Sequence, residues 1–340
     1  MKRRCVVFQA PGRVKSALEA MPDPAADEAL VQIEASAISA GTELLIYRGQ
    51  APPDMPMDAR LPGLSSPFRF PLRYGYAAAG TVTATGRQVD PAWVGRRVFG
   101  FWPHASHVIS RPAELVPIPE GIGFRDALFL ANMETAVTLV LDGLPAVGEH
   151  VVVFGQGIVG LLAASLLSAY PLASLFAVEP LALRRKASLQ AGAHAVFDPA
   201  RPQALIDRLR EATDGGMADA VFELSGHPAA LDAAIAAAGF GARIVVGSWY
   251  GARPVAVNLG GRFHRSRIRL IGSQVSTLPP EFMARWSRQR RYTAAWDQIR
   301  RITPSRLITH EIPAEAAGEA YALLDRNPGQ ALQVLLTYRQ

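Results

Sequence analysis

The sequence predicts an α/β protein in two parts, a mainly β domain and a domain built on a doubly wound parallel sheet. Residues 150–272 alternate short β-branched runs with Ala- and Leu-rich segments, which is typical of a parallel sheet covered on both faces. Residues 1–137 instead carry short strand patterns separated by prolines and turn residues. A length of 340 residues also exceeds one ordinary core and favours two domains.

In chain order, the first elements are short strands in the segments 27–39 and 77–89. Six strand candidates follow at 150–154, 174–179, 194–198, 218–224, 242–247 and 268–272. The helix candidates between them, such as 184–193 and 227–239, each end near a glycine that closes a helix. The tail ends in one more strand, which we expect to return to the first domain. The expected domains are therefore 1–137 with 276–340, and 138–275.

Composition excludes several classes of protein. The chain is 49% hydrophobic and 19% charged, as soluble globular proteins are. The apolar run 158–178 is divided by Pro171, so we expect a buried helix and a buried strand and no membrane span. The N-terminus lacks the apolar segment of a secretory signal, so the expected location is cytoplasmic. Cys5 is the single cysteine, which excludes an internal disulfide and a cysteine cluster for structural zinc.

The formal net charge of +6 is carried mainly by arginine. The segment 285–301 interleaves aromatic residues with arginines, as a nucleic-acid-binding helix does. Its residues Trp286, Trp296, Ile299 and Ile302 equally suit the inner stripe of a surface helix with solvated arginines outside. We favour the surface helix and expect no nucleic-acid partner.

The stretch VVVFGQGIVG contains a GxGxxG motif between a predicted strand and a predicted helix. In this context the glycines permit a tight turn, close approach of the backbone to a pyrophosphate, and packing of helix on strand. Glu179 ends the second strand, where a carboxylate accepts hydrogen bonds from the adenosine ribose and repels a 2′-phosphate. NAD(H) is therefore favoured over NADP(H), although Arg184 and Arg185 are near enough to accommodate a phosphate.

With these domains in this order, the chain resembles the medium-chain dehydrogenase/reductase superfamily over nearly its full length. The resemblance rests on SAISAGTELLIYRG (36–49), PLRYGYAAAGTV (71–82) and VFELSGHPAALDAA (221–234). It implies a GroES-like catalytic domain, a Rossmann cofactor domain and commonly a homodimer. The cofactor-binding residues that we expect are Gly155, Gln156, Gly157, Ile158, Val159, Gly160, Glu179, Arg184, Ser225, Gly226, Gly247 and Ser248.

The chain departs from the zinc alcohol dehydrogenases of this superfamily at the metal ligands. Ala40 stands at the position of their cysteine ligand, and Tyr76 and Ala77 replace their His-Glu pair. Glu134 matches a third, carboxylate ligand of some members, but one carboxylate cannot hold a catalytic zinc. His104 and His107 lie in a segment that we expect to be a strand. These departures predict a member without zinc.

Without zinc, hydrogen bonds must stabilise the substrate oxygen. Tyr76 offers a phenolic donor, Thr42 matches the hydroxyl that relays the alcohol proton in zinc members, and Glu134 is expected to orient the phenol or a water. The alternative is that Tyr76 packs as an ordinary aromatic side chain. For Glu43 we expect a structural ion pair and no role as a base.

Residues 36–56 and the GY pair also resemble a subgroup containing the bacteriochlorophyllide hydroxyethyl dehydrogenases. That resemblance favours a secondary alcohol or ketone as the small-molecule substrate, and a site opened by the loop from Ala51 to Arg73. One alternative is an NADPH-dependent enoyl or quinone reductase, which in this superfamily also lacks zinc. A second alternative is a nucleotide-binding module without catalysis.

Overall fold

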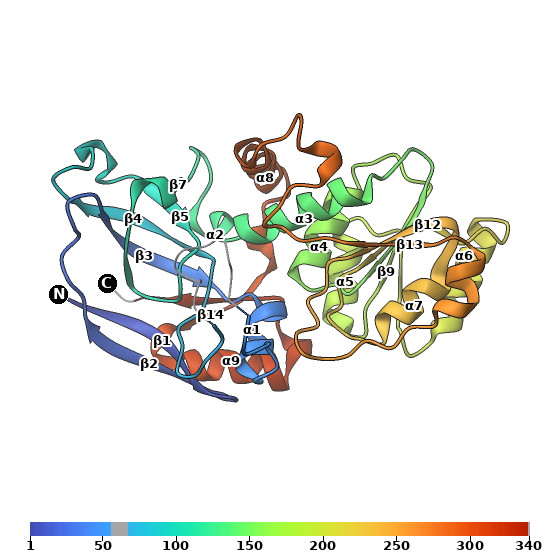
Figure 1. The fold of residues 1–340 in the computed structure, drawn as a ribbon, viewed down its shortest axis with the longest axis horizontal. Helices are drawn as coiled ribbons and strands as arrows, with labels where there is room; N and C mark the ends of the chain where they lie inside the picture. Colours follow the sequence, from blue (N-terminus) through green and yellow to red (C-terminus); the bar gives the residue numbers. More distant parts are fainter. Residues whose placement is uncertain (56–66, 339–340) are drawn as a thin grey trace. The chain divides into compact units, whose positions relative to one another are not determined.

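The computed structural model describes residues 1–55 and 67–338, and Figure 1 traces the chain. The chain divides into two compact units: Met1–Ala131 together with Ile299–Gln340, and Asn132–Gln298. The first is mainly β and the second contains a parallel sheet, so the predicted fold class is confirmed. The second unit extends further at both ends than the expected domain 138–275.

The second unit is built on a sheet with six strands among the described residues, in the order β10-β9-β8-β11-β12-β13. These strands are β8 (His150–Phe154), β9 (Ser174–Val178), β10 (Ala195–Phe197), β11 (Ala218–Glu223), β12 (Ala238–Val246) and β13 (Arg269–Gly272). All pairs are parallel, and each strand overlaps a run expected from the sequence. The chain enters at β8 and winds outward in both directions, which defines a doubly wound sheet.

The strands of this sheet are joined by helices that lie alongside it in Figure 1. They are α4 (Ile158–Leu167), α5 (Ala182–Gln190), α6 (Pro202–Ala212) and α7 (Ala230–Ala237). Leu209 of α6 and Ile235 of α7 are buried in the core that includes Val152 and Ile244 of the sheet. The apolar run 158–178 is helix α4 followed by strand β9, as predicted. Among the described residues, no helix is long and apolar enough to cross a membrane.

Helices α3 (Leu130–Gly143) and α8 (Arg288–Ile302) explain why the second unit is wider than expected. Arg291 of α8 donates hydrogen bonds to Thr138 Oγ1 (3.1 Å) and to the Glu134 carboxylate, both on α3. This contact holds residues beyond 275 to residues before 138. The expected inner stripe of the arginine-rich segment is present, because Trp296 and Ile299 are buried. Arg291 does not join the solvated face, since it is only 3% exposed.

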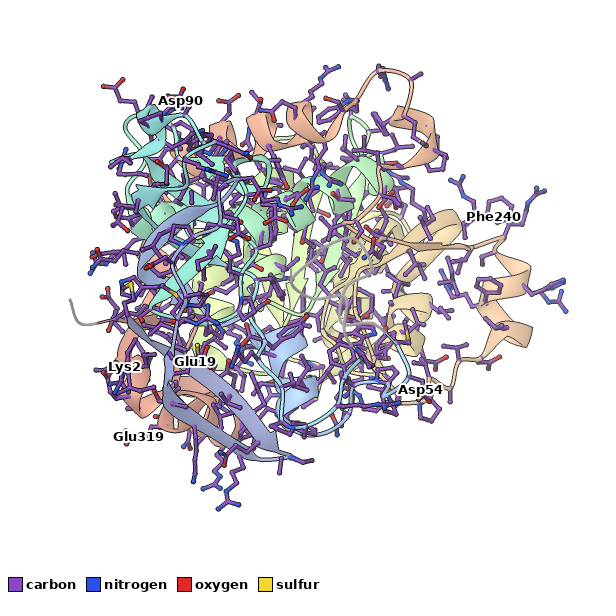
Figure 2. All side chains as sticks on the ribbon, turned by 60° about the vertical axis from the view of Figure 1, so that its left-hand side comes forward. Lys2, Glu19, Asp54, Asp90, Phe240 and Glu319 are labelled. Carbon is purple, nitrogen blue, oxygen red and sulfur yellow. The ribbon has the colours of Figure 1, made fainter. Side chains whose placement is uncertain are left out.

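The first unit contains a seven-stranded sheet and a two-stranded pair among the residues described. The sheet follows the order β14-β15-β3-β4-β5-β7, with β6 paired to β3. The strands are β1 (Lys2–Ala10), β2 (Arg13–Ala20), β3 (Ala29–Ala37), β4 (Ala78–Thr85), β5 (Arg97–Gly100), β6 (His107–Ser110), β7 (Val116–Pro117), β14 (Ile308–Pro313) and β15 (Gln333–Thr337). Lys2 and Glu19, labelled in Figure 2, lie on the β1–β2 pair.

The C-terminal tail returns to the first unit, as expected, and helps to position its short helices. Strand β15 pairs antiparallel with β3, so that Leu335 lies opposite Ala37. The helices are α1 (Ala40–Tyr47), α2 (Phe124–Ala127) and α9 (Ala317–Arg326). The ring of Tyr321 on α9 stacks on Tyr47 of α1 with centroids 5.7 Å apart. Helix α1 therefore begins directly after a central strand and is held by the tail.

The predicted site-opening loop from Ala51 to Arg73 is described only in part. Residues 56–66, its central portion, lie outside the described residues. The role expected for this loop stays a prediction.

Candidate active site

The glycine motif forms the turn between β8 and α4. Gly155 has a φ of 84°, and a Cβ at this position would lie 2.3 Å from Ser225 Cα. A Cβ at Gly160 would lie 2.0 Å from the carbonyl oxygen of Gly155, so only glycine permits this packing of helix on strand. A Cβ at Gly157 would meet no described atom within 4 Å, so Gly157 faces open space.

This turn fits a dinucleotide pyrophosphate. Gly157 is the N-cap residue of α4 and has no side chain that could accept a hydrogen bond. The backbone N–H groups of the first helical turn, which includes Ile158 and Val159, are therefore not capped by a side chain. A helix N-terminus with free N–H groups beside open space attracts phosphate oxygens. Gln156 is fully buried, and its Oε1 accepts no hydrogen bond from a described residue. The residues at this turn are therefore suited to the cofactor that the motif predicts.

Glu179 lies beside the glycine turn, one residue beyond the end of β9. Its carboxylate accepts hydrogen bonds from the backbone amides of Gln156 (2.7 Å) and Leu181 (3.1 Å), and the residue is 3% exposed. Glu179 is thus brought to the expected phosphate site and also supports the turn itself. Arg184 is half-buried, and its Nε has no hydrogen-bond partner among the described residues.

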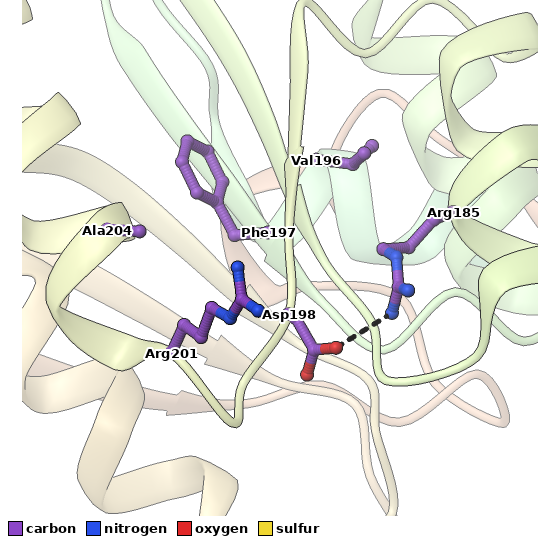
Figure 3. Close-up of a pocket in the computed structure, with 6 residues that line it drawn as sticks. All are labelled: Arg185, Val196, Phe197, Asp198, Arg201 and Ala204. Atoms are coloured by element: carbon purple, nitrogen blue, oxygen red, sulfur yellow. Dashed lines mark hydrogen bonds and ion pairs between the residues drawn. The ribbon is translucent and has the colours of Figure 1, made fainter.

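A cavity of about 390 Å³ lies at the carboxyl end of β10. Figure 3 shows the side chains that line it. Arg185, Phe197, Asp198 and Arg201 are among the side chains that line it. Arg185 is held there because its Nη1 donates to Asp198 Oδ2 (3.2 Å) and to the carbonyl oxygen of Glu179 (2.9 Å). Arg185 is therefore committed to protein groups, whereas the Nε of Arg184 is not.

The remaining expected cofactor residues lie on the loops after β11 and β12. The amide of Gly226 donates to Ser248 Oγ (2.8 Å), and the amide of Gly247 donates to the carbonyl oxygen of Glu223 (3.0 Å). Ser225 adjoins the glycine turn, as its contact with Gly155 indicates. The strand order reverses between β8 and β11, because the chain continues from β8 to β9 on one side and from β11 to β12 on the other. Doubly wound proteins bind ligands at this switch point, beyond the carboxyl ends of the strands, and the loops after β11 and β12 leave the sheet at that edge.

In the first unit, three hydroxyl groups gather at the start of α1. The Tyr76 hydroxyl donates a hydrogen bond to Ser39 Oγ and lies 3.4 Å from Thr42 Oγ1. The pKa of Tyr76 is raised above its ordinary value, mainly because the side chain is buried. The hydrogen bonds to Ser39 and Thr42 lower this pKa, and the charge of Glu43 raises it further. The phenol is consequently a protonated donor at neutral pH. Ser39 was not among the expected site residues. It is the N-cap residue of α1, but its side chain makes no capping hydrogen bond, so a capping signal in the sequence does not indicate its contact with Tyr76.

Glu43 is fully buried among polar partners. Its Oε2 accepts from His104 Nε2 (2.9 Å) and from the Tyr321 hydroxyl, and its Oε1 accepts from the backbone amide of Ser39 (2.7 Å). The expectation of a structural pair for Glu43 agrees with these contacts. The expectation that His104 lies in a strand is wrong: β6 begins at His107, and His104 occupies a bend before it.

Glu134 belongs to α3 in the second unit, where it forms a buried ion pair with Arg291; their side chains are 5% and 3% exposed. Burial raises the pKa of Glu134, against the lowering effect of Arg291 and Arg288. The carboxylate therefore has a cationic partner already. Its expected role toward Tyr76 stays a prediction.

Within residues 1–55 and 67–338, no group of three or more His, Cys, Asp or Glu side chains is arranged to hold a metal ion. Ala40 and Ala77 have no donor side chains at the positions that carry ligands in the zinc alcohol dehydrogenases.

Comparison with known proteins places the chain among the dehydrogenases. The family described as "Zinc-binding dehydrogenase" matches residues 159–289. The D-guloside 3-dehydrogenase of Escherichia coli is 25% identical, over 92% of this chain and 93% of its own length. The 2-desacetyl-2-hydroxyethyl bacteriochlorophyllide A dehydrogenase of Cereibacter sphaeroides is 30% identical, over 100% of this chain and 99% of its own.

Among solved structures, an E. coli protein described as a short chain alcohol dehydrogenase complexed with NADH has a TM-score of 0.79. It is 18% identical and the comparison covers 99% of both chains. At this identity the similarity shows a shared fold.

Proposed function

The chain belongs to the medium-chain dehydrogenase/reductase superfamily and is an NAD(P)-dependent oxidoreductase of the alcohol dehydrogenase type, and we propose that it works without zinc. In this proposal it transfers a hydride between NAD(H) and a small molecule that is a secondary alcohol or the corresponding ketone. The relatives reported above are named for a guloside and for a hydroxyethyl-bearing macrocycle, which supports an alcohol and ketone pair. We further propose a cytoplasmic homodimer, as the resemblance to the superfamily implies.

The observation that carries the proposal is the group of hydroxyls formed by Tyr76, Ser39 and Thr42. Tyr76 stands where the zinc members have a histidine ligand, and Ala40 stands where they have a cysteine. A hydroxyl group that is held by neighbours and aimed at the substrate oxygen can stabilise its developing charge as a metal does. The ion pair of Glu134 with Arg291 also supports a site without zinc, because it engages the carboxylate that would complete a ligand set.

The division of labour follows from the chemistry of each group. Bound nicotinamide supplies or accepts the hydride. The turn at Gly155–Gly160 holds the pyrophosphate by the N-terminus of α4, with Glu179 beside it. In ketone reduction the carbonyl carbon takes the hydride, while Tyr76 donates a hydrogen bond to the carbonyl oxygen and then the proton that makes the alcohol. The phenolate that this leaves takes a proton back from solvent before the next turnover. Ser39 and Thr42 accept from or donate to the phenol as its charge changes, because a hydroxyl does both.

We propose NAD(H) as the cofactor because Glu179 places a carboxylate next to the glycine turn. The unpartnered Nε of Arg184 is the one observation that favours NADP(H) instead. Glu179→Ser tests this: we expect weaker NADH binding and a smaller preference over NADPH. Arg184→Met is the matched control, and if it reduces NADPH binding strongly while Glu179→Ser changes nothing, the preference is assigned to the wrong residue.

The function is tested by following oxidation of NADH and NADPH with panels of ketones, enones and quinones. We expect turnover with NADH and ketones, and the reverse reaction with secondary alcohols and NAD. Selective reduction of enones or quinones with NADPH would identify the alternative reductase. Binding of NADH without turnover of any panel member, in a sample that is folded, would contradict the proposal.

A further inference from the structure

A buried polar cluster lies beneath the hydroxyls at Tyr76. Glu43 and His104 at its centre are both 0% exposed. His104 Nδ1 lies 2.7 Å from Ser36 Oγ, and Ser36 Oγ lies 2.8 Å from the Tyr338 hydroxyl. Replacement of such buried pairs by apolar residues is often neutral or stabilising, so stability alone is a weak explanation for this cluster.

The cluster touches the Tyr76 region at two points. Glu43 Oε1 accepts from the Ser39 amide (2.7 Å), and Ser39 Oγ in turn accepts from the Tyr76 hydroxyl. His104 supports the backbone just before Tyr76: a Cβ at Gly75, whose φ is 128°, would lie 2.9 Å from the imidazole ring. The backbone amide of His104 also donates to the carbonyl oxygen of Tyr74 (3.1 Å).

We propose that Glu43 and His104 are positioning residues: Glu43 holds Ser39 by its amide, His104 shapes the turn at Gly75, and Ser39 then fixes the direction of the Tyr76 hydroxyl. The catalytic meaning of this arrangement rests on the proposed function, but the arrangement itself does not. Three contacts carry it, namely Glu43 to Ser39, Ser39 to Tyr76, and His104 against Gly75. All of them join residues of the first unit.

The groups that face Tyr76 predict how its pKa responds to substitution. On the segment that starts α1 these are Ser39, Thr42 and Glu43, and on its own loop the ring of Tyr74 stands edge-on at 6.0 Å. The Ser39 hydrogen bond lowers the pKa of Tyr76, and the charge of Glu43 raises it. Loss of the first interaction and loss of the second should therefore have opposite effects.

The test titrates Tyr76 by NMR in protein with isotope-labelled tyrosine, using Tyr76→Phe to assign the signal. We expect Ser39→Ala to raise the pKa of Tyr76 and Ser39→Thr to restore it. Glu43→Gln keeps an oxygen for the Ser39 amide and removes only the charge, so it should lower the pKa of Tyr76. Glu43→Ala also releases Ser39, so in that background Ser39→Ala should shift the pKa less than in wild type. Ser16→Ala is the matched control, because Ser16 is a half-buried serine of the same unit bonded to Arg4, and it should change nothing. No shift with Ser39→Ala, or an equal shift with Ser39→Ala in the wild-type and Glu43→Ala backgrounds, would overturn the proposal.

The positioning role of His104 is tested with double variants that combine His104→Ala and Ser39→Ala. In a His104→Ala background the turn at Gly75 loses the imidazole ring that packs against it, so Ser39→Ala should move the Tyr76 pKa less than in wild type. An unchanged response to Ser39→Ala in folded His104→Ala protein removes His104 from the positioning set. If Glu43→Gln or His104→Ala does not fold, the Ser39 pair alone decides whether Ser39 orients the phenol.

These titrations need neither cofactor nor substrate, so they separate the inference from the function. If the Tyr76 pKa does not shift in a protein that reduces ketones, the positioning proposal is wrong and the proposed ketone reductase function is supported. The expected shifts in a protein that turns over no ketone or alcohol support the positioning and contradict the function.

Discussion

At the scale of single residues, the surroundings of Tyr76 agree with the chemical role that we propose for it. A tyrosine that only fills space needs one hydrogen-bond partner for its hydroxyl. Tyr76 has Ser39 and Thr42 close to its hydroxyl, while its ring meets Tyr74 edge-on. The phenol therefore has one hydroxyl neighbour more than packing alone requires.

Tyr76→Phe keeps the ring and removes only the hydroxyl, so it separates chemistry from packing. We expect turnover of the best ketone to fall on the order of 100-fold, as loss of one oxyanion donor does. NADH affinity and the thermal unfolding midpoint should stay near wild type, and they are the controls. A decrease of less than about threefold, far below the oxyanion-donor range, would make Thr42 the leading donor.

At the scale of elements, the β8–α4 turn contains two glycines whose replacement by alanine should have different effects, one on NADH binding and the other on stability. Gly157→Ala should leave stability nearly unchanged, because its Cβ meets no described atom, but should weaken NADH binding by occupying the space for the pyrophosphate. Gly160→Ala should destabilise the second unit, because its Cβ would lie 2.0 Å from the Gly155 carbonyl oxygen. Calorimetric binding of NADH and thermal unfolding measure the two effects. Equal NADH affinity for Gly157→Ala and wild type would contradict the assigned phosphate site.

Arg243 of β12 links this strand to the end of α3 and to the segment before β8. Its Nη1 donates to Glu149 Oε1 (2.8 Å), and its other nitrogens donate to the carbonyl oxygens of Gly143 and Leu144. Burial raises the pKa of Glu149, but the bonds from Arg243 and from the Ala146 amide outweigh it and hold the pKa below its ordinary value of 4.5. This contribution to stability is present above that value and is lost as pH falls through the folded-state pKa.

Arg243→Met should therefore destabilise the protein at neutral pH by about 2 kcal/mol, as loss of a hydrogen-bonded charge does. The difference from wild type should shrink as the pH falls below about 4.5. Urea unfolding at several pH values measures it, with Arg269→Met on the neighbouring strand as the control for loss of one surface arginine. A difference that is constant across this pH range would exclude the Glu149 linkage.

Elements differ in how far the sequence predicts them, and the reason is the range of the interactions involved. Strand β8 was predictable because Val151–Val153 form a continuous buried run, a local signal that a parallel sheet produces. The glycine turn was predictable because its motif spans six neighbouring residues and the constraint on Gly160 comes from Gly155 within that motif, although the constraint on Gly155 comes from the distant Ser225. His104 was wrongly assigned to a strand, because the contact that fixes its position is with Glu43, 61 residues away, and a local sequence pattern does not indicate such a contact. Ser39 was missed for the same reason, since its partner Tyr76 is 37 residues away.

At the scale of the whole molecule, the two units divide the tasks that the proposed reaction requires. The second unit holds the glycine turn, Glu179 and the loops after β11 and β12, all at the carboxyl edge of one sheet. The first unit holds Tyr76, Ser39 and Thr42 on the segments that flank β3 and β4. The residues proposed for the cofactor and those proposed for the substrate therefore belong to different compact units of the chain.

The zinc question also concerns the whole chain, because every residue able to bind zinc has to be considered. Ala40 and Tyr76 replace ligands, Glu134 is paired with Arg291, and burial raises the pKa of the Cys5 thiol to about 11, which disfavours the thiolate that zinc requires. We therefore expect elemental analysis of the purified protein to find far less than one zinc ion per chain. Turnover and the thermal midpoint should be unchanged by a strong chelator, while a zinc alcohol dehydrogenase treated in parallel loses its metal and activity. One tightly bound zinc per chain whose removal abolishes turnover would show that the Tyr76 hydroxyl does not replace the metal.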